Sequence, residues 1–182
     1  MVYTTKELLE LGESDYSIRK KLEEESLFLI ERGLYSTNPN EKHLDEVAIC
    51  KKFPSSILTG ISAFHIHGLT DLIPDKFYLA TLQHSFPIRR DDVVQSYQDE
   101  SFFDIGMMYV QYTEYGNIRI YDLERMLIEL FRLKEKYPPE LFYEVVNSFR
   151  KMKHHINFYR VNQYLEHFSN GKSLQQKIKE YI

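Results

Sequence analysis

The 182-residue sequence contains no tryptophan, a single cysteine and no apolar run longer than a few residues. Such short runs exclude a membrane-spanning helix, and the N-terminus lacks the basic and then apolar layout of a signal peptide, so we expect a cytoplasmic protein with no membrane partner. Cys50 has no second cysteine to pair with, and its apolar neighbours predict a buried thiol in a helix. Hydrophobic residues make up 43% of the chain, which is typical of a folded protein.

Catalytic and metal-binding patterns are also missing. There is no Gly-rich phosphate loop, no Gly-x-Ser-x-Gly elbow, and no Gly-Ser followed by paired aspartates as in nucleotidyltransferases. His65 and His67 are two positions apart, so on a helix they point in nearly opposite directions, and the adjacent His154 and His155 have the same difficulty. We therefore expect no metal site and no cofactor.

Three carboxylates, Asp71, Asp122 and Glu124, are the remaining candidates for an active site. Helix capping explains Asp122 more simply, and Glu124 is more simply the partner of Arg125 in a structural ion pair. We predict no catalytic residues and no enzymatic activity.

Charge is distributed unevenly along the chain. Residues 1–131 hold 13 Lys/Arg against 22 Asp/Glu, whereas residues 132–182 hold 10 against 5. A basic C-terminal region can face a polyanion, or its lysines can simply be solvated. The candidates for such a basic surface are Arg150, Lys151, Lys153 and Arg160.

The first 36 residues have the pattern of a winged helix-turn-helix. Thr4 and Glu7 form a capping-box pattern that predicts a helix over about 4–11, ended by Gly12. Ser14 predicts the cap of a second helix, and Leu27 to Tyr35 reads as two strands around a turn at 31–33.

In a winged helix-turn-helix the second helix lies in the major groove of DNA. Its apolar face is expected to include Tyr16, Ile18 and Leu22. The predicted DNA contacts are Ser14, Tyr16, Ser17, Arg19, Lys20 and Lys21 on the helix and Arg32 at the wing tip. Residues 1–46 carry 6 basic and 11 acidic side chains, so any DNA surface here must be local.

A second domain, residues 37–182, follows a polar connector at 37–43. Helices are predicted at about 43–52 and 56–67, strands at 77–82, 107–112 and 118–121 with a turn at 115–117, and an Asp122-capped helix to about 136. Further helices are expected at 139–152, 156–168 and 173–181, the last capped by Ser173 after a stop at Asn170-Gly171. The prediction is an α+β fold: an α+β core over about 43–131 and a basic helical region over about 132–182.

Four short runs in this domain resemble the AbiEi-type antitoxin family. They are His67-Gly-Leu-Thr-Asp71, Ile73-Pro74, the strand from Phe77 to Ala80, and Asp122-Leu-Glu-Arg125-Met126-Leu127. Together with the N-terminal unit they cover nearly the whole chain in order. The resemblance implies an autoregulator from a type IV toxin–antitoxin operon of phage defence by abortive infection. It further implies a winged helix-turn-helix that binds promoter DNA, and antagonism of a nucleotidyltransferase toxin without a stable complex.

The sequence departs from the family pattern in three places. Only three residues precede Thr4, the wing carries Glu31-Arg32 where a basic pair is usual, and Met126 replaces an expected threonine. The first two departures weaken the case for tight DNA binding by the N-terminal unit. The alternative hypothesis is a module that does not bind DNA and recognises a protein or an RNA, for which the Tyr- and Phe-rich C-terminal helices are a candidate surface.

Overall fold

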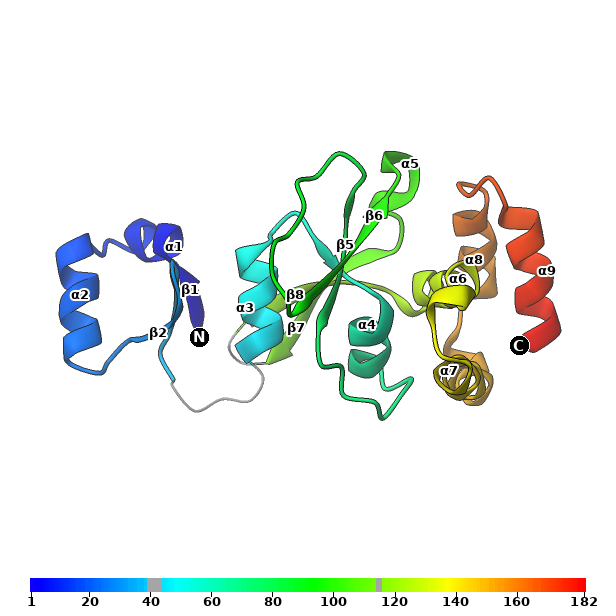
Figure 1. Ribbon diagram of the computed structural model, residues 1–182, viewed down its shortest axis with the longest axis horizontal. Helices are drawn as coiled ribbons and strands as arrows, with labels where there is room; N and C mark the ends of the chain where they lie inside the picture. The colour runs from blue at the N-terminus through cyan, green and yellow to red at the C-terminus, as the bar shows by residue number, and fades with distance from the viewer. Residues whose placement is uncertain (39–43, 114–115) are drawn as a thin grey trace. The chain divides into compact units, whose positions relative to one another are not determined.

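The structure, a computed structural model, describes residues 1–38, 44–113 and 116–182 of a mixed α+β chain (Figure 1). The α+β class predicted from the sequence is therefore confirmed. The chain divides into two compact units: residues 1–55 with 109–119 form unit 1, and residues 56–108 with 120–182 form unit 2. This division does not follow the boundary predicted at residue 36, because the next helix and the segment 109–119 group with the N-terminal residues.

Unit 1 begins with β1 (Val2–Thr4), α1 (Thr5–Glu10), α2 (Asp15–Glu23), β2 (Phe28–Glu31) and β3 (Leu34–Ser36). The two helices and the hairpin are confirmed, whereas β1 was not predicted. Strand β3 lies between β1 and β2 and is antiparallel to both. Leu8, Ile18 and Leu27 are buried together and hold the helices against this small sheet.

Both predicted N-terminal caps are present. The Thr4 hydroxyl accepts from the Glu7 amide, and the Glu7 carboxylate accepts from the Thr4 amide. At α2 the same reciprocal arrangement joins Ser14 and Ser17. Each cap satisfies amides that the first helical turn would leave without a partner, which fixes where the helix starts.

Helix α3 (Leu44–Lys52) also belongs to unit 1 and carries Cys50, which is buried as predicted. Lys51 on this helix donates to a Glu7 carboxylate oxygen at 2.5 Å. Lys52 donates to the Arg32 carbonyl at 2.9 Å. Positions 39–43 of the predicted connector lie outside the described residues.

The larger sheet contains β4 (Ile57–Leu58), β5 (Phe77–Leu82), β6 (Val93–Gln98), β7 (Met107–Thr113) and β8 (Gly116–Tyr121), in the spatial order β6-β5-β4-β8-β7. Strand β4 is antiparallel to β5 and parallel to β8, and β5 is parallel to β6. Strands β5, β7 and β8 are confirmed, although positions 114–115, which include part of the predicted turn, lie outside the described residues. Strand β6 was not predicted.

The helix predicted over 56–67 is wrong in its first part. Ile57 and Leu58 form β4 and are fully buried between two neighbouring strands, and α4 (Gly60–Ile66) starts only after Thr59. Two apolar residues carry no periodicity of their own, so their pairing with β5 and β8 decides their conformation.

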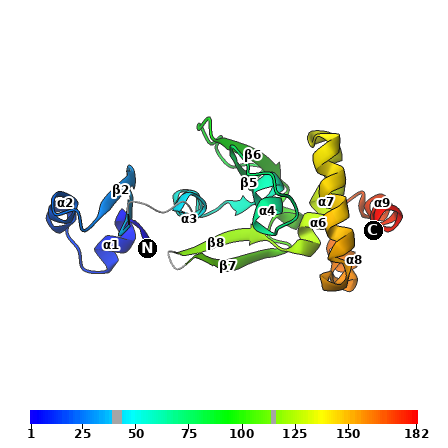
Figure 2. The ribbon, with the colours of Figure 1, turned by 90° about the horizontal axis from the view of Figure 1, so that it is seen from below.

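The remaining helices of unit 2 are α5 (Glu100–Phe103), α6 (Leu123–Arg132), α7 (Pro139–Lys151), α8 (Phe158–Leu165) and α9 (Gly171–Tyr181), with 3₁₀ turns η1 (Lys134–Lys136) and η2 (Lys153–His155). Helices α6, α8 and α9 pack against one another (Figure 2). The Asp122 cap of α6 is confirmed.

The predicted start of the last helix is wrong. Helix α9 begins at Gly171, two residues before Ser173, and its N-cap residue is Asn170. Glycine is needed at 171 because a Cβ there would lie 2.0 Å from the Leu165 carbonyl oxygen. Gly171, which was predicted to end a helix, instead permits a close approach between α8 and α9.

Candidate functional site

The outward face of α2 is the surface on which DNA contacts were predicted. Ile18 is buried, and Leu22 is half-buried against the same core. Tyr16 was expected on the apolar face, but it is 78% exposed and lies with Arg19 and Lys20 on the outward side. The helix thus presents an aromatic ring and two basic side chains to solvent.

Ser14 and Ser17 are engaged within the cap of α2. The Ser17 hydroxyl donates to a Glu13 carboxylate oxygen at 2.6 Å and accepts from the Ser14 amide at 2.8 Å. The hydrogen bond that Glu13 accepts from Lys21, together with the one from the Ser17 hydroxyl, holds the pKa of Glu13 below its usual range. The start of α2 is therefore anchored by its own side chains.

The basic residues of this region differ in their partners. Lys21 pairs with Glu13, and Lys20 lies 3.6 Å from Glu24 one turn later. Arg19 and the side chain of Arg32 are exposed, and no residue that the structure describes pairs with either of them. Arg19 is consequently the most available cation on α2.

The four C-terminal basic candidates differ in their partners. Arg150 donates to the Tyr181 carbonyl at 2.6 Å, and Lys153 donates to the Ile182 carbonyl at 2.8 Å. Arg160 lies 3.8 Å from both Asp122 and Glu124. Lys151 is exposed at the end of α7, with no partner among the described residues. Three of these side chains thus stabilise helix ends or face carboxylates.

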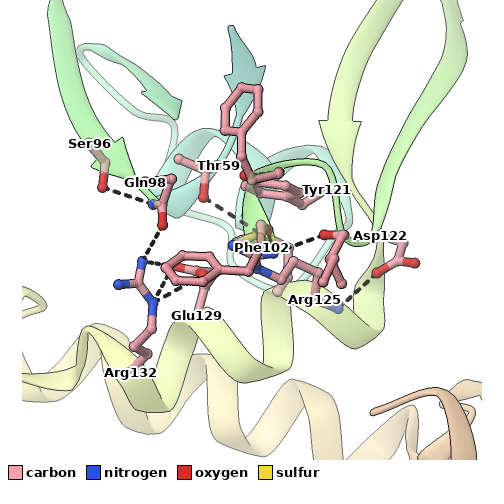
Figure 3. Close-up of polar contacts among 12 residues, drawn as sticks. Thr59, Ser96, Gln98, Phe102, Tyr121, Asp122, Arg125, Glu129 and Arg132 are labelled. Atoms are coloured by element: carbon pink, nitrogen blue, oxygen red, sulfur yellow. Dashed lines mark hydrogen bonds and ion pairs between the residues drawn. The ribbon is translucent and has the colours of Figure 1, made fainter. Parts of the chain in front are cut away.

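A buried polar network lies between α6 and the strands and loops that α6 covers (Figure 3). Arg125 and Glu129 are both fully buried and pair one helical turn apart, with Arg125 Nε 2.9 Å from Glu129 Oε1. Arg132 Nη2 also donates to Glu129, at 2.6 Å, and to the Gln98 side chain at 2.8 Å. Gln98 in turn donates to the Ser96 hydroxyl at 3.2 Å. The Glu129 carboxylate thus accepts from two guanidinium groups, and Arg132 links α6 to β6 through Gln98.

Arg125 is further enclosed by aromatic rings and backbone carbonyls. Its guanidinium lies 4.4 Å from the Tyr121 ring centroid and 5.0 Å from that of Phe168. Nη1 donates to the carbonyls of Phe102 and Ile105. Among the described residues, Nη2 has no hydrogen-bond partner. The ion pair expected between Arg125 and Glu124 is therefore wrong, since Arg125 pairs with Glu129.

Glu124 and its neighbour Asp122 contact helix α8 instead. The Glu124 carboxylate accepts from the Asn157 amide at 2.9 Å, which attaches the start of α8 to α6. The neighbouring Asp122 caps α6 and accepts from the Tyr164 hydroxyl at 2.8 Å. Burial raises the pKa of Asp122. The two carboxylates organise helix packing around α6.

The histidines considered as metal ligands do not converge. His67 Nε2 lies 2.7 Å from the Tyr121 carbonyl oxygen, and burial lowers its pKa. His154 and His155 are exposed neighbours in η2. Within residues 1–38, 44–113 and 116–182, no group of three or more His, Cys, Asp or Glu side chains has the arrangement of a metal site.

No protein-family model and no curated protein matches the chain. A solved structure does: the RV2827C protein from Mycobacterium tuberculosis superposes with a TM-score of 0.61 over 100% of this chain and 71% of that one. The identity is 14%. The likeness is one of fold. Of the helices described, none is long and apolar enough to cross a membrane.

Sequence reasoning missed Glu129, Arg132 and Gln98. The i, i+4 spacing of Arg125 and Glu129 within a predicted helix was a usable signal for the ion pair. No local signal connects Gln98 to Arg132, because they are 34 positions apart and come together only through the fold.

Proposed function

We propose that this protein is an AbiEi-type antitoxin that also binds the promoter DNA of its own operon as a repressor. The observation that supports the proposal is the outward face of α2, where Tyr16, Arg19 and Lys20 are exposed on a helix whose start is anchored by a double serine cap. The resemblance of the later runs, from His67 to Asp71 and from Asp122 to Leu127, supports the family. The proposed activity is binding, with no catalytic step.

In the proposed binding mode the N-terminal unit acts as a winged helix-turn-helix. Helix α2 enters the major groove, where Tyr16 contacts sugar or base edges and Arg19 and Lys20 contact phosphates. The β2–β3 hairpin is the wing, and the Arg32 guanidinium at its tip contacts a phosphate of the adjacent DNA backbone. The carbonyl of Arg32 accepts a hydrogen bond from Lys52, which stabilises the tip and leaves the guanidinium available.

Antitoxicity is proposed to act against a nucleotidyltransferase toxin without a stable complex. This half of the proposal depends on the family resemblance. Growth rescue of a host that expresses the toxin, by the full chain, tests it directly. A host that stays arrested while the antitoxin is present in soluble form would contradict it.

A second candidate is an interaction module that does not bind DNA. The observation that favours it is that Lys20 and Lys21 already lie beside glutamates. A lysine paired with a carboxylate must leave that partner to neutralise a phosphate. The two candidates therefore differ in whether Lys20 contributes to a salt-dependent association with DNA.

Lys20→Ala, compared with Lys6→Ala, separates the two candidates. The two lysines are matched: each is exposed on a helix of unit 1 and pairs with a glutamate four residues later, at 3.6 Å for Lys20 and 3.7 Å for Lys6. Both changes remove one positive charge and one weak ion pair, so their effects on folding should be alike. Only Lys20 lies on the proposed DNA face.

The measurement is fluorescence anisotropy of the full chain on its own upstream DNA, with scrambled DNA as competitor and over a series of salt concentrations. Losing one phosphate contact makes the negative slope of log K against log salt shallower by about 0.9 and weakens binding about eightfold at 0.1 M salt. Lys6→Ala should leave both quantities unchanged. Equal losses of DNA affinity for the two variants, or equal binding of specific and scrambled DNA, would contradict the proposed repressor function and favour the interaction module.

A further inference from the structure

The loop between α4 and β5, residues 67–76, exposes two large apolar side chains although its backbone is fixed. Leu72 is 48% exposed and Ile73 77% exposed. The loop is part of the His67-to-Pro74 run singled out in the sequence, and neither the DNA face nor the buried network of α6 uses its exposed residues. Its apolar tip is therefore a feature without an assigned role.

The loop is anchored directly before this tip. Leu69 is fully buried, and its amide donates to the Phe64 carbonyl at 2.8 Å. The hydroxyl of the buried Thr70 donates to Glu144 Oε1 at 2.8 Å, and the Asp71 amide donates to the same oxygen at 3.0 Å. The Thr70 hydroxyl also accepts from the Leu72 amide at 3.1 Å. The exposure of Leu72 and Ile73 is therefore built into the folded loop.

These contacts join the loop to α7, the helix to which Glu144 belongs. The two exposed apolar side chains, Leu72 and Ile73, form what we name the 72/73 patch. Fixed apolar side chains of this size, rimmed by polar residues, are typical of protein interaction sites.

The surroundings of the patch are acidic. Asp71 and Asp75 flank the apolar pair in the loop, and both are exposed. On α7, Glu144 is exposed and Glu140 lies one turn before it. Lys76 is the exposed basic residue of this loop. The carboxylates are notable because the C-terminal region that contains α7 is basic as a whole.

We propose that the 72/73 patch docks an apolar segment of a protein partner that is flanked by lysine or arginine. The apolar side chains of the segment cover Leu72 and Ile73, and its basic side chains meet the carboxylates of Asp71, Asp75 and Glu140. Charge complementarity selects this occupant over a nucleic acid, whose phosphates the same carboxylates repel. It also disfavours face-to-face pairing of two copies, which places the two acidic rims together. The proposal is independent of DNA binding by α2.

Two synthetic amphipathic peptides test the proposal on the full chain. One is built from leucine and lysine and the other from leucine and glutamate, with the same spacing and one tryptophan each. Because the protein has no tryptophan, the fluorescence of the peptide reports binding without interference. The Leu/Lys peptide should bind, more weakly at higher salt, and the Leu/Glu peptide should not.

Ile73→Asp is the decisive variant, with Phe86→Asp as its matched control. Both residues are strongly exposed on loops of unit 2, 77% and 93% respectively, so neither change should disturb folding. Each adds one negative charge. If charge alone attracted the Leu/Lys peptide, both variants would bind it more tightly, whereas docking on the patch predicts that Ile73→Asp weakens binding about tenfold or more.

Glu144→Gln separates the charge of the rim from the anchoring of the loop. The glutamine side-chain oxygen can still accept from Thr70 and from the Asp71 amide, so the loop keeps its conformation and only one charge is lost. Binding of the Leu/Lys peptide should weaken about two- to threefold, and only at low salt. Equal binding of the two peptides, tighter binding by Ile73→Asp, or equal effects of Ile73→Asp and Phe86→Asp would each overturn the proposal.

Discussion

Replacing Glu129 by glutamine should strongly destabilise unit 2. The change keeps the size of the side chain but removes the one negative charge among the described residues that contacts the guanidinium of the fully buried Arg125. Arg125 would keep the carbonyls of Phe102 and Ile105 and its aromatic neighbours, none of which carries a compensating charge. Removing one partner of a buried ion pair costs about 3–5 kcal/mol.

The cost should fall near the middle of that range, because Glu129 serves two cations but only one of them, Arg125, is fully buried. Arg132, which is partly exposed, can turn to solvent and keep Gln98, so most of the loss arises at Arg125. For a chain of this length 1 kcal/mol corresponds to roughly 2–4 °C in unfolding temperature, and 4 kcal/mol therefore to roughly 8–16 °C. Circular dichroism during heating, supported by urea titration, measures the shift.

Glu135→Gln is the control for this measurement. Glu135 is exposed in η1, three residues after Arg132, and its neutralisation removes the same charge without uncovering a buried partner. Its unfolding temperature should stay within about 2 °C of the parent protein. If Glu129→Gln also stayed within that interval, the buried pair would not be a principal source of stability, and the reasoning from its burial would be wrong.

Two further predictions concern unit 1. Burial raises the pKa of Glu7, but hydrogen bonds from Lys51 and Thr4 outweigh it and leave the pKa below its ordinary value of 4.5. The stability it contributes is present above that pH and is lost as the pH falls below it, so the difference between the urea midpoints of the parent and Glu7→Gln should be largest near pH 6 and should shrink as the pH falls below 4.5. A constant difference across that range would contradict the assignment. Burial raises the pKa of the Cys50 thiol to about 11, so a thiol reagent at pH 8 should label the native protein slowly and one equivalent promptly in urea. Fast labelling of the native chain would show that α3 opens readily.

The sequence predicted those elements whose ends are marked by local chemistry. Thr4, Ser14 and Asp122 each cap the helix expected from them, because a cap depends on residues within one turn. Strand β4 escaped prediction since two apolar residues become a strand only through neighbours far along the chain. Strand β6 escaped for a similar reason: its six residues show no clear alternation, and its pairing with β5 defines it.

The candidate sites show the same limit. That α2 would carry exposed basic residues followed from its periodicity, but the glutamates beside Lys20 and Lys21 alter what those residues can offer a phosphate. The wrong partner for Arg125 had a simple origin: adjacent residues on a helix point in different directions, whereas residues four apart share a face. Contacts such as that between Thr70 and Glu144, 74 positions apart, cannot be deduced from spacing.

The division of the chain into two units has a consequence for how the gene of such a protein can change by recombination. The backbone passes from one compact unit to the other three times, near residues 55, 108 and 119. Gly116, in the inserted segment, faces α3 so closely that a Cβ would lie 2.7 Å from Val47 Cγ1. A single genetic crossover that exchanged the N-terminal 55 residues for those of another gene would separate these two positions. The first unit can therefore be exchanged intact only together with residues 109–119, so it is expected to diverge by point substitution more readily than by shuffling.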